Sequence, residues 1–261
     1  MRLLALLLLA PWLAFADKPV DAGPYVPSPQ SVVSDMLKLA GVGPKDFVVD
    51  LGSGDGRIVR TAALVFGARG FGVEIKDELV RQANADAARE GIAERVKFVN
   101  ADLFKTDISQ ATVLTLYLLP HTVNLLRDKL LTELKPGTRV LSHDYPLTGW
   151  IPEKYVQMDL EDKVKISGVT TTLIYLYVVP AKVEGRWRVS APGGPQAIEL
   201  KQQITRVSGT ALHLGREVAL ENVKLRGEQL SFRLAGREFA GAVSGASIQG
   251  EGGAWSAQRV R

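Results

Sequence analysis

Residues 48–57 read VVDLGSGDGR, a short apolar run that leads into three glycines and then into Arg57. A buried strand, a glycine turn and a helix start in this order are typical of the ligand-binding edge of an α/β sheet. Glycines let the backbone approach a ligand closely, and a helix start offers unpaired N–H groups. The G-x-G-x-G spacing, led by Asp50, departs from the dinucleotide pattern G-x-G-x-x-G. It therefore favours a ligand without a pyrophosphate.

Strand and helix patterns alternate on both sides of this loop. The expected strands are residues 47–51, 70–75, 96–99, 111–119 and 138–142, and the expected helices are 30–40, 57–66, 77–90 and 122–134. Such alternation predicts an α/β fold, a Rossmann-like sheet that is mostly parallel and has helices on both faces. Two further strands, 155–159 and 169–179, are expected as an antiparallel hairpin at the sheet edge, which brings the total to seven.

The last 79 residues differ in character from the rest. Residues 183–261 are rich in glycine and carry short alternating stretches at 197–204, 218–225, 230–234 and 239–243. This pattern predicts a small antiparallel sheet or partial barrel, with a boundary near 180–184. Residues 181–261 hold 12 Lys and Arg against 7 Asp and Glu, a net charge of +5. The basic surface is expected to be solvated, with docking to an acidic partner, an anionic envelope surface or a second subunit as alternatives.

Composition excludes several classes of protein. The chain has no cysteine, so disulfides, thiolate metal sites and cysteine nucleophiles are absent. Its three histidines have no zinc-motif spacing, and no metal is expected. A formal charge of +4 over 261 residues is weak for a nucleic-acid-binding protein, and no nucleic-acid partner is expected.

The N-terminus has the pattern of a secretory signal peptide. Arg2 precedes an apolar run over residues 3–15, and Ala14-Phe15-Ala16 is a small-residue cleavage site. We predict a signal peptide over 1–16, a proline-rich extended segment over 17–29, and domains over 30–180 and 183–261. The exported protein would be periplasmic or secreted and would carry no stable transmembrane segment. Retention of the apolar N-terminus as an anchor on the cytoplasmic face is the alternative.

Two acidic residues follow the next strands at positions suited to a nucleoside. Glu74 ends the second strand, 20 residues after Gly54, where a carboxylate can accept hydrogen bonds from ribose hydroxyls. Asp102 follows the third strand, where it can accept a hydrogen bond from the amino group of adenine, and Leu103 or Phe104 can flank the ring. Ligands of open α/β sheets bind at these carboxyl ends of strands.

With these motifs, residues 25–180 resemble the class I S-adenosylmethionine-dependent methyltransferases. The resemblance implies that S-adenosylmethionine is the cofactor, that Glu74 holds its ribose and that Asp102 holds its adenine. The methionine part is then held by Asp50 or by the loop backbone, whose family-matching positions are Gly52, Ser53, Gly54 and Gly56.

The methyl acceptor is less directly indicated. The fourth strand ends in Tyr117-Leu-Leu-Pro and lacks the Asn/Asp-Pro-Pro-Tyr motif of many amino-methylating members. The combination of this ending with the Tyr-Val-Pro-x-Pro entry at 25–29 and the loop at 50–57 is similar to the group that includes the ATP synthase c-subunit lysine N-methyltransferases. That resemblance implies a protein lysine as substrate. An aromatic channel would lower the pKa of that lysine by desolvation. Its candidate residues are Tyr25, Tyr117, Tyr145 and Trp150.

His143 follows the fifth strand and is a candidate to relay a proton or to hold the substrate, with a structural histidine at a strand end as the alternative. Two other functions stay open. One is methylation of a small molecule, and the other is a non-catalytic envelope protein that reuses the fold to bind a nucleoside-like ligand or a partner. The second follows from a conflict, because export removes the protein from the compartment where S-adenosylmethionine is made.

Overall fold

The computed structural model describes residues 23–164 and 168–260. The predicted signal peptide and residues 17–22 of the proline-rich segment lie outside the described residues. Within the described part of the chain, no helix combines the length and the apolar character needed to cross a bilayer.

The first sheet has seven strands in the order β3-β2-β1-β4-β5-β7-β6. Strands β1 to β5 are parallel, and β7 runs antiparallel to both β5 and β6. The expected seven-stranded, mostly parallel sheet is confirmed. Its strands are β1 (Phe47–Leu51), β2 (Arg69–Glu74), β3 (Val96–Asn100), β4 (Val113–Leu116), β5 (Arg139–His143), β6 (Lys154–Asp159) and β7 (Thr171–Val178).

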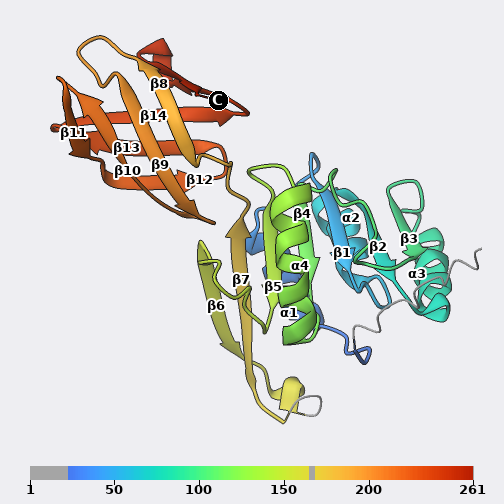
Figure 1. Cartoon of the computed structure of the whole chain (residues 1–261). Coiled ribbons are helices and arrows are strands. Elements are labelled where there is room, and N and C mark those ends of the chain that lie inside the picture. The colour runs from blue at the N-terminus through green and yellow to red at the C-terminus, as the bar shows by residue number, and fades with distance from the viewer. Residues whose placement is uncertain (1–22, 165–167, 261) are drawn as a thin grey trace, which may run out of the picture.

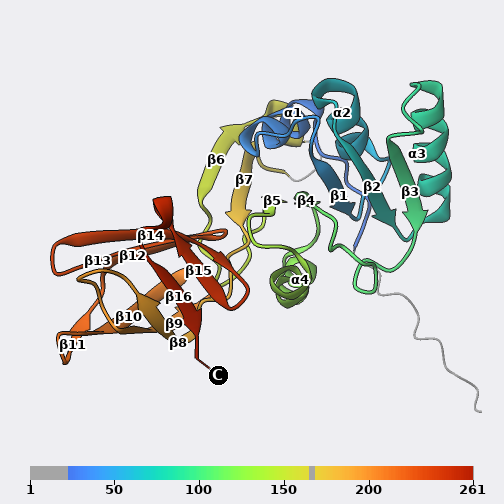
Figure 2. The same ribbon diagram turned by 90° about the horizontal axis from the view of Figure 1, so that it is seen from above.

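Helices cover the two faces of this sheet unequally. Helices α1, α2 and α3 lie on one face, and α4 lies on the other, as Figure 2 shows from above. Their bounds are α1 (Gln30–Leu39), α2 (Arg57–Phe66), α3 (Asp77–Arg89) and α4 (Pro120–Glu133). The apolar stripe expected for the first helix is buried, with Val32, Val33, Met36 and Leu37 fully enclosed.

The connection from β4 to α4 differs from the sequence expectation. The apolar run 111–119 forms only the four-residue strand β4, and α4 begins at Pro120. Proline is well suited to the first position of a helix, because its missing N–H would have no partner there and its fixed φ is already helical. The prediction followed the length of the apolar run and therefore made the strand too long. The start of the helix is set by the proline instead.

A second sheet of nine antiparallel strands follows β7, in the order β11-β10-β9-β8-β16-β15-β14-β13-β12. It is larger than the small sheet that we predicted, because the repeated glycines sit in tight turns between strands. The predicted stretch 218–225 also proves to be two strands that meet at Leu220. The strands are β8 (Gly185–Ser190), β9 (Ala197–Gln203), β10 (Arg206–His213), β11 (Arg216–Ala219), β12 (Glu221–Arg226), β13 (Gln229–Leu234), β14 (Arg237–Ser244), β15 (Ser247–Gly250) and β16 (Ser256–Arg259).

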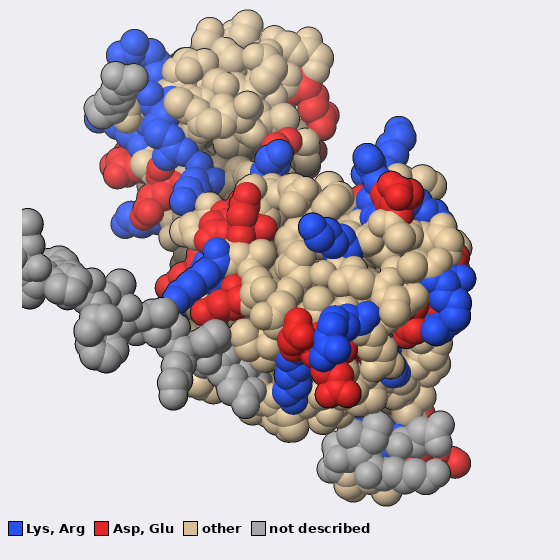
Figure 3. All heavy atoms as spheres, turned by 90° about the vertical axis from the view of Figure 1, so that its right-hand side faces the viewer, with Lys and Arg blue, Asp and Glu red and all other residues tan. Residues whose placement is uncertain are grey.

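The second sheet encloses its own core. Phe232 stacks on Phe239 at 5.1 Å between ring centroids, and Trp255 meets both rings edge-on at 5.7 Å. Arg186 and Arg188 on β8 are exposed, while Trp187 between them is fully buried, as strand alternation requires. Figure 3 shows blue side chains along one flank of this part of the molecule.

The second sheet joins the first at the edge where the parallel strands begin (Figure 1). The carbonyl of Gly227 accepts the N–H of Ala181, just beyond β7. A Cβ at Gly227 would lie 3.1 Å from the Cα of Gly137, just before β5. Arg226 also pairs with Glu153, next to the start of β6, at 2.7 Å. The carboxyl ends of the parallel strands, where ligands of such sheets bind, lie at the opposite edge.

A substitution at Gly56 tests how closely the glycine turn packs on the sheet. Its φ is 78°, and a Cβ would lie 2.5 Å from the ring of Phe98 and 3.0 Å from Ala83. Gly56→Ala should lower the free energy of unfolding by about 2–5 kcal/mol, combining a left-handed alanine with overpacking. Gly91→Ala is the matched control, since its φ is 71° with open space around it, and it should cost only about 1–2 kcal/mol. Equal losses in urea denaturation would contradict this account of Gly56.

Candidate active site

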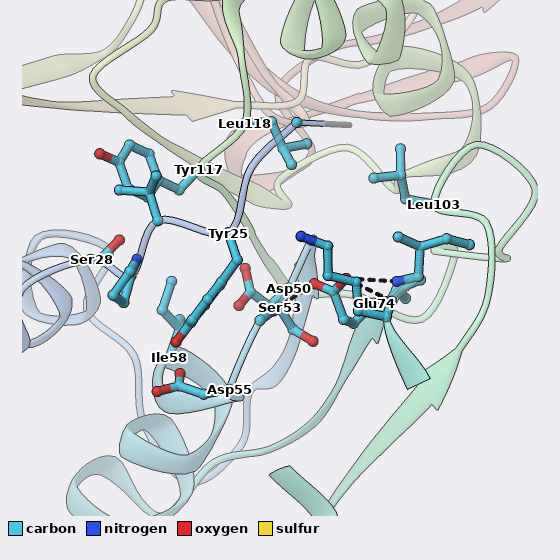
Figure 4. A pocket seen from close by; sticks show the side chains of 18 of the residues that line it. Tyr25, Ser28, Asp50, Ser53, Asp55, Ile58, Glu74, Leu103, Tyr117 and Leu118 are labelled. Carbon is cyan, nitrogen blue, oxygen red and sulfur yellow. Dashed lines mark hydrogen bonds between the residues drawn. The ribbon is translucent and has the colours of Figure 1, made fainter. Parts of the chain in front are cut away.

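A cavity with a volume of about 270 Å³ lies at the carboxyl ends of β1, β2 and β4. A strap formed by residues 23–28 lines one side, and the glycine turn, Glu74 and Asp102 line the others (Figure 4). The lining residues come from separate strand ends, so the cavity exists only once the sheet has formed. Seven of the eight predicted cofactor residues line it, namely Asp50, Gly52, Ser53, Gly54, Glu74, Asp102 and Leu103.

The glycine turn is shaped by contacts that exclude side chains. The backbone N–H groups of Gly52 and Ser53 both donate to the carbonyl of Val73 on β2. Gly52 and Gly54 have φ values of 80° and 54°, and a Cβ at Gly54 would collide with the Tyr25 ring. Gly56 does not line the cavity, so its expected cofactor contact is replaced by packing against Phe98.

Glu74 fastens this turn while it lines the cavity. Its carboxylate accepts the N–H of Gly54 at 3.0 Å and the N–H groups of Ile75 and Lys76 at 2.9 Å each. The side chain is only 8% exposed, so these charge-assisted bonds are shielded from water. One carboxylate thereby connects β2 to the loop that follows β1.

Asp102 and Leu103 form the wall beyond β3. The Asp102 carboxylate accepts the N–H of Phe104 at 2.8 Å, and its carbonyl accepts the N–H groups of Lys105 and Thr106. These bonds hold the turn after β3 in place, and Leu103 presents an apolar, buried side chain to the cavity. A flat ring next to a carboxylate is the kind of ligand that this wall accommodates.

Asp50 makes the base of the cavity unusual. It is 2% exposed and accepts the Thr115 hydroxyl at 2.6 Å. Burial raises the pKa of Asp50 to about 7, and the negative charges of Glu74 and Asp55 contribute to the increase, against the effect of the Thr115 bond. The Ser53 hydroxyl is buried nearby with no hydrogen-bond partner among the described residues. This set of groups fits a cationic, hydrogen-bonding ligand.

S-adenosylmethionine has these properties, since it carries an ammonium, a sulfonium, a ribose and an adenine. The residues present therefore fit the cofactor: Asp50 and the turn would hold its methionine part, Glu74 would hold the ribose, and Asp102 would hold the adenine. When bound, the cofactor supplies an electrophilic methyl group. Among the described residues no cluster of three metal-ligating side chains exists.

The strap is fastened to the turn and to β5. Arg57 pairs with Asp55 through Nη2 at 2.6 Å and donates Nη1 to the Ser28 carbonyl at 2.9 Å. The Ser28 hydroxyl lies 2.9 Å from His143 Nδ1. Burial raises the pKa of the Tyr25 hydroxyl, and its interaction with Asp55 adds to the increase. Tyr25, a predicted substrate contact, thus packs against the cofactor turn.

Tyr117 lines the cavity, whereas His143 lies behind it. The two rings stack with centroids 3.9 Å apart. His143 is fully buried, and its Nε2 lies 3.3 Å from the Thr172 hydroxyl. Burial lowers the pKa of His143 to about 4. With no exposure and both ring nitrogens next to hydroxyls, His143 occupies a structural position, and the geometry does not support the proton relay that we predicted.

The other two predicted substrate contacts lie in different places. Tyr145 lines the cavity. Trp150 is 3% exposed and packs on Tyr177 at 5.2 Å between ring centroids, in the core beneath α4. Trp150 therefore does not reach the cavity as we expected, because the chain turns away from the cavity after Tyr145 and runs back along the sheet.

Sequence reasoning did not single out Ser28, Asp55 or Arg57 as parts of the site. Asp55 and Arg57 belong to the quoted motif, and their spacing suggests a local ion pair. Ser28 gave no signal, because its partners are 29 and 115 residues away.

Fold and cavity together define a class I S-adenosylmethionine-dependent methyltransferase. A family model, the ANTKMT methyltransferase domain, matches residues 50–154. A protein-lysine N-methyltransferase of Saccharolobus islandicus is 43% identical over 157 residues, which are 60% of this chain and 93% of that protein. The chain belongs to the methyltransferase family that contains this archaeal enzyme.

Two further relatives extend the comparison. An ATP synthase c-subunit lysine N-methyltransferase of Xenopus laevis is 35% identical over 130 residues, which cover 50% of this chain and 57% of that protein. The chain thus spans just over half the length of the vertebrate relative. A solved structure, described as an RNA methyltransferase from Salinibacter ruber in complex with S-adenosyl-L-homocysteine, is 46% identical. It has a TM-score of 0.54 and covers 60% of this chain and 96% of its own.

Asp50 predicts a pH dependence of cofactor binding. Because its pKa is raised to about 7 in the free protein, Asp50 is protonated below that pH and must lose a proton to meet a cationic ligand. The Kd for S-adenosylmethionine should rise by up to about tenfold for each pH unit below 7. Asp50→Asn should bind more weakly at pH 8 and remove most of this dependence. Asp77→Asn, an exposed change on α3, is the control. The Kd for S-adenosylmethionine of each protein is measured by titration calorimetry between pH 5.5 and 8.5. An unchanged slope in Asp50→Asn would assign the dependence to another group.

Proposed function

We propose that this protein transfers the methyl group of S-adenosylmethionine to the side-chain amine of a protein lysine. The observation that carries the proposal is the 43% identity to a protein-lysine N-methyltransferase over 93% of that enzyme's length. Aromatic cavity walls support it, because Tyr117 and Tyr145 line the cavity next to the cofactor turn.

The chemistry requires a neutral amine and a straight approach to the methyl group. Deprotonating a lysine with an ordinary pKa near 10.4 costs roughly 4–5 kcal/mol at pH 7. Tyrosine rings and the apolar Leu118 exclude water from the cavity wall, and desolvation lowers the pKa of a lysine inserted there. The chain's remaining task is alignment, which can lower the barrier without any covalent step on the protein.

Methylation of RNA is the competing function, because the Salinibacter structure carries that description. The mixed charge of this chain argues against it, since residues 1–180 hold 20 Lys and Arg against 21 Asp and Glu. Nucleic-acid binding draws its affinity chiefly from cations that neutralise phosphates. Sensitivity of the labelled product to protease or to RNase distinguishes lysine methylation from RNA methylation.

We also propose that residues 1–16 direct export. The proposal rests on Arg2, on the apolar run over 3–15 and on the Ala14–Ala16 site. Protein purified from the envelope of its own host should begin at Asp17 in N-terminal sequencing. Recovery of intact Met1 from the cytoplasm would contradict export.

Transfer of labelled methyl groups tests the acceptor. Extract from a strain lacking the protein is incubated with the purified protein and [methyl-³H]S-adenosylmethionine. The extract should gain label in a protease-sensitive, RNase-resistant form, and acid hydrolysis of the labelled material should release methyllysine. Glu74→Gln is the inactive control, because it removes a charged acceptor from the cavity wall and should weaken cofactor binding at least about tenfold. Asp77→Asn should label like the wild type. Label released by RNase would replace the lysine proposal with the RNA function.

A further inference from the structure

The first sheet ends in an open strand edge that has no neighbouring strand among the described residues. Strand β6 pairs with β7, and Figure 1 shows it as the outermost strand, running from the side of the second sheet to the short helix η1 (Glu161–Lys163). Native edges are usually blunted by charges, prolines or bulges, because their unpaired backbone groups are a template for another chain. Strand β6 has none of these devices between Lys154 and Asp159, the charged residues at its two ends.

The central part of this edge turns its backbone groups away from the sheet. The register partner of Gln157 on β7 is Leu173, whose N–H and carbonyl are both bonded to Asp144 on the other side of β7. Backbone groups alternate in direction along an antiparallel ladder. The N–H and the carbonyl of Gln157 therefore point outward, and so do those of Tyr155 and Asp159.

Apolar side chains accompany the open backbone. Tyr155 is 66% exposed, and Ile151, just before β6, is 48% exposed. The Tyr155 ring lies next to that of Tyr175 on β7, with 6.4 Å between centroids, and the two rings form an aromatic shelf beside the edge. An extended chain placed along β6 would pair its backbone with the strand and cover this shelf with alternate side chains.

The edge leads to the cavity. Lys163 of η1 places Nζ 2.7 Å from Oδ1 of Asp144, which follows β5 and precedes the cavity residue Tyr145. This mostly buried ion pair fixes the end of β6 relative to the cavity wall. A strand added to β6 would lie three strand spacings, about 14 Å, from β5. About four or five extended residues cover that distance, so a lysine of the same chain can reach the cavity.

Charge is distributed unequally along the edge. At the cavity end, Asp159 and Glu161 are exposed. At the far end Lys154 is exposed, next to the pair of Arg226 and Glu153 that joins the second sheet. A partner chain that is basic near its acceptor lysine and acidic at its far end is complementary to both ends.

A second copy of the chain fits this edge less well. In a two-fold antiparallel ladder, residues that lie opposite one another point to the same face, so their positions differ by an even number. Lys154 and Asp159 lie five positions apart, and no such ladder pairs their opposite charges. A ladder centred on Gln157 would instead place each Tyr155 opposite an Asp159.

We propose that β6 is the docking edge for the acceptor protein, which adds an extended segment to the first sheet. This segment lies along β6 between the second sheet and η1, and the acceptor lysine lies about four to six residues beyond it. Main-chain hydrogen bonds supply the affinity in such strand addition, and contacts of alternate side chains supply the selectivity. The inference rests on the proposed lysine methylation, and it makes an accessible extended segment a requirement of the substrate.

Two full-length variants at Gln157 separate the backbone from the side chain. Gln157→Pro removes the outward N–H and keeps the β6–β7 ladder, because an edge strand tolerates proline where the missing N–H faces outward. Gln157→Thr keeps that N–H. The probe is the protein fraction of extract from a strain lacking the protein. Gln157→Pro should lower the initial rate of methyllysine formation about tenfold, and Gln157→Thr should stay within about twofold of the wild type. The Kd for S-adenosylhomocysteine and the urea midpoint should be unchanged in both.

Two exposed substitutions test the side chains and decide the matter if Gln157→Pro does not fold. Tyr155→Ser removes half of the aromatic shelf, and Glu161→Lys reverses the charge at the cavity end. Each should lower the same rate about threefold or more. Glu94→Lys, an exposed charge reversal just before β3 at the opposite edge of the sheet, is the control and should label like the wild type.

Several results would overturn the inference. One is labelling by Gln157→Pro as fast as by Gln157→Thr, and another is a loss of labelling matched by an equal loss of cofactor affinity. Wild-type rates in both Tyr155→Ser and Glu161→Lys would have the same meaning. A wild-type dimer in sedimentation that Gln157→Pro dissociates would assign the edge to a second copy. Absence of labelled methyllysine with the wild type would remove the proposed function itself, whereas failure of the docking alone leaves methyllysine formation intact in every variant.

Discussion

The site depends on one carboxylate. Glu74 accepts three backbone N–H groups, those of Gly54, Ile75 and Lys76, and it does so with little exposure to water. The turn after β1 is thereby held against the end of β2, and the start of α2 is fixed with it. One side of the cavity is placed by this turn, because Tyr25 lies on Gly54 and Arg57 holds the strap.

Holding the turn in this way gathers three carboxyl groups around one cavity. Asp50, Asp55 and Glu74 repel one another, and the raised pKa of Asp50 expresses that repulsion together with burial. Arg57 compensates Asp55 directly, while Asp50 has only the neutral Thr115 as a side-chain hydrogen-bond partner among the described residues. The clustered carboxyl groups of the free protein therefore favour the binding of a positive charge, which explains why an ammonium and a sulfonium are suitable ligands.

The parts of the fold and site that the sequence could predict are those whose interactions lie close together along the chain. The turn, Glu74 and Asp102 were predictable, because each follows a strand whose apolar run is visible and strand ends meet at one edge. The packing role of Gly56, the burial of Trp150 and the position of His143 depend on what lies across the sheet. The pairing of Asp144 with Lys163 joins residues that follow two different strands, β5 and β6, and no local pattern predicts it. Tertiary partners of this kind leave no periodic signal in a single sequence.

The arrangement of the two sheets separates the chemistry from the basic C-terminal part. The second sheet contacts the first near Gly137, Glu153 and Val178, at the edge where the parallel strands begin. The cavity lies at the other edge, and none of the described residues of β8 to β16 lines it. The net positive charge of this part therefore acts at a distance from the methyl transfer. Any contribution of the second sheet to substrate choice must come from contacts remote from the cavity, which requires a partner large enough to span both edges. A protein or an assembly meets that requirement, and a small metabolite does not.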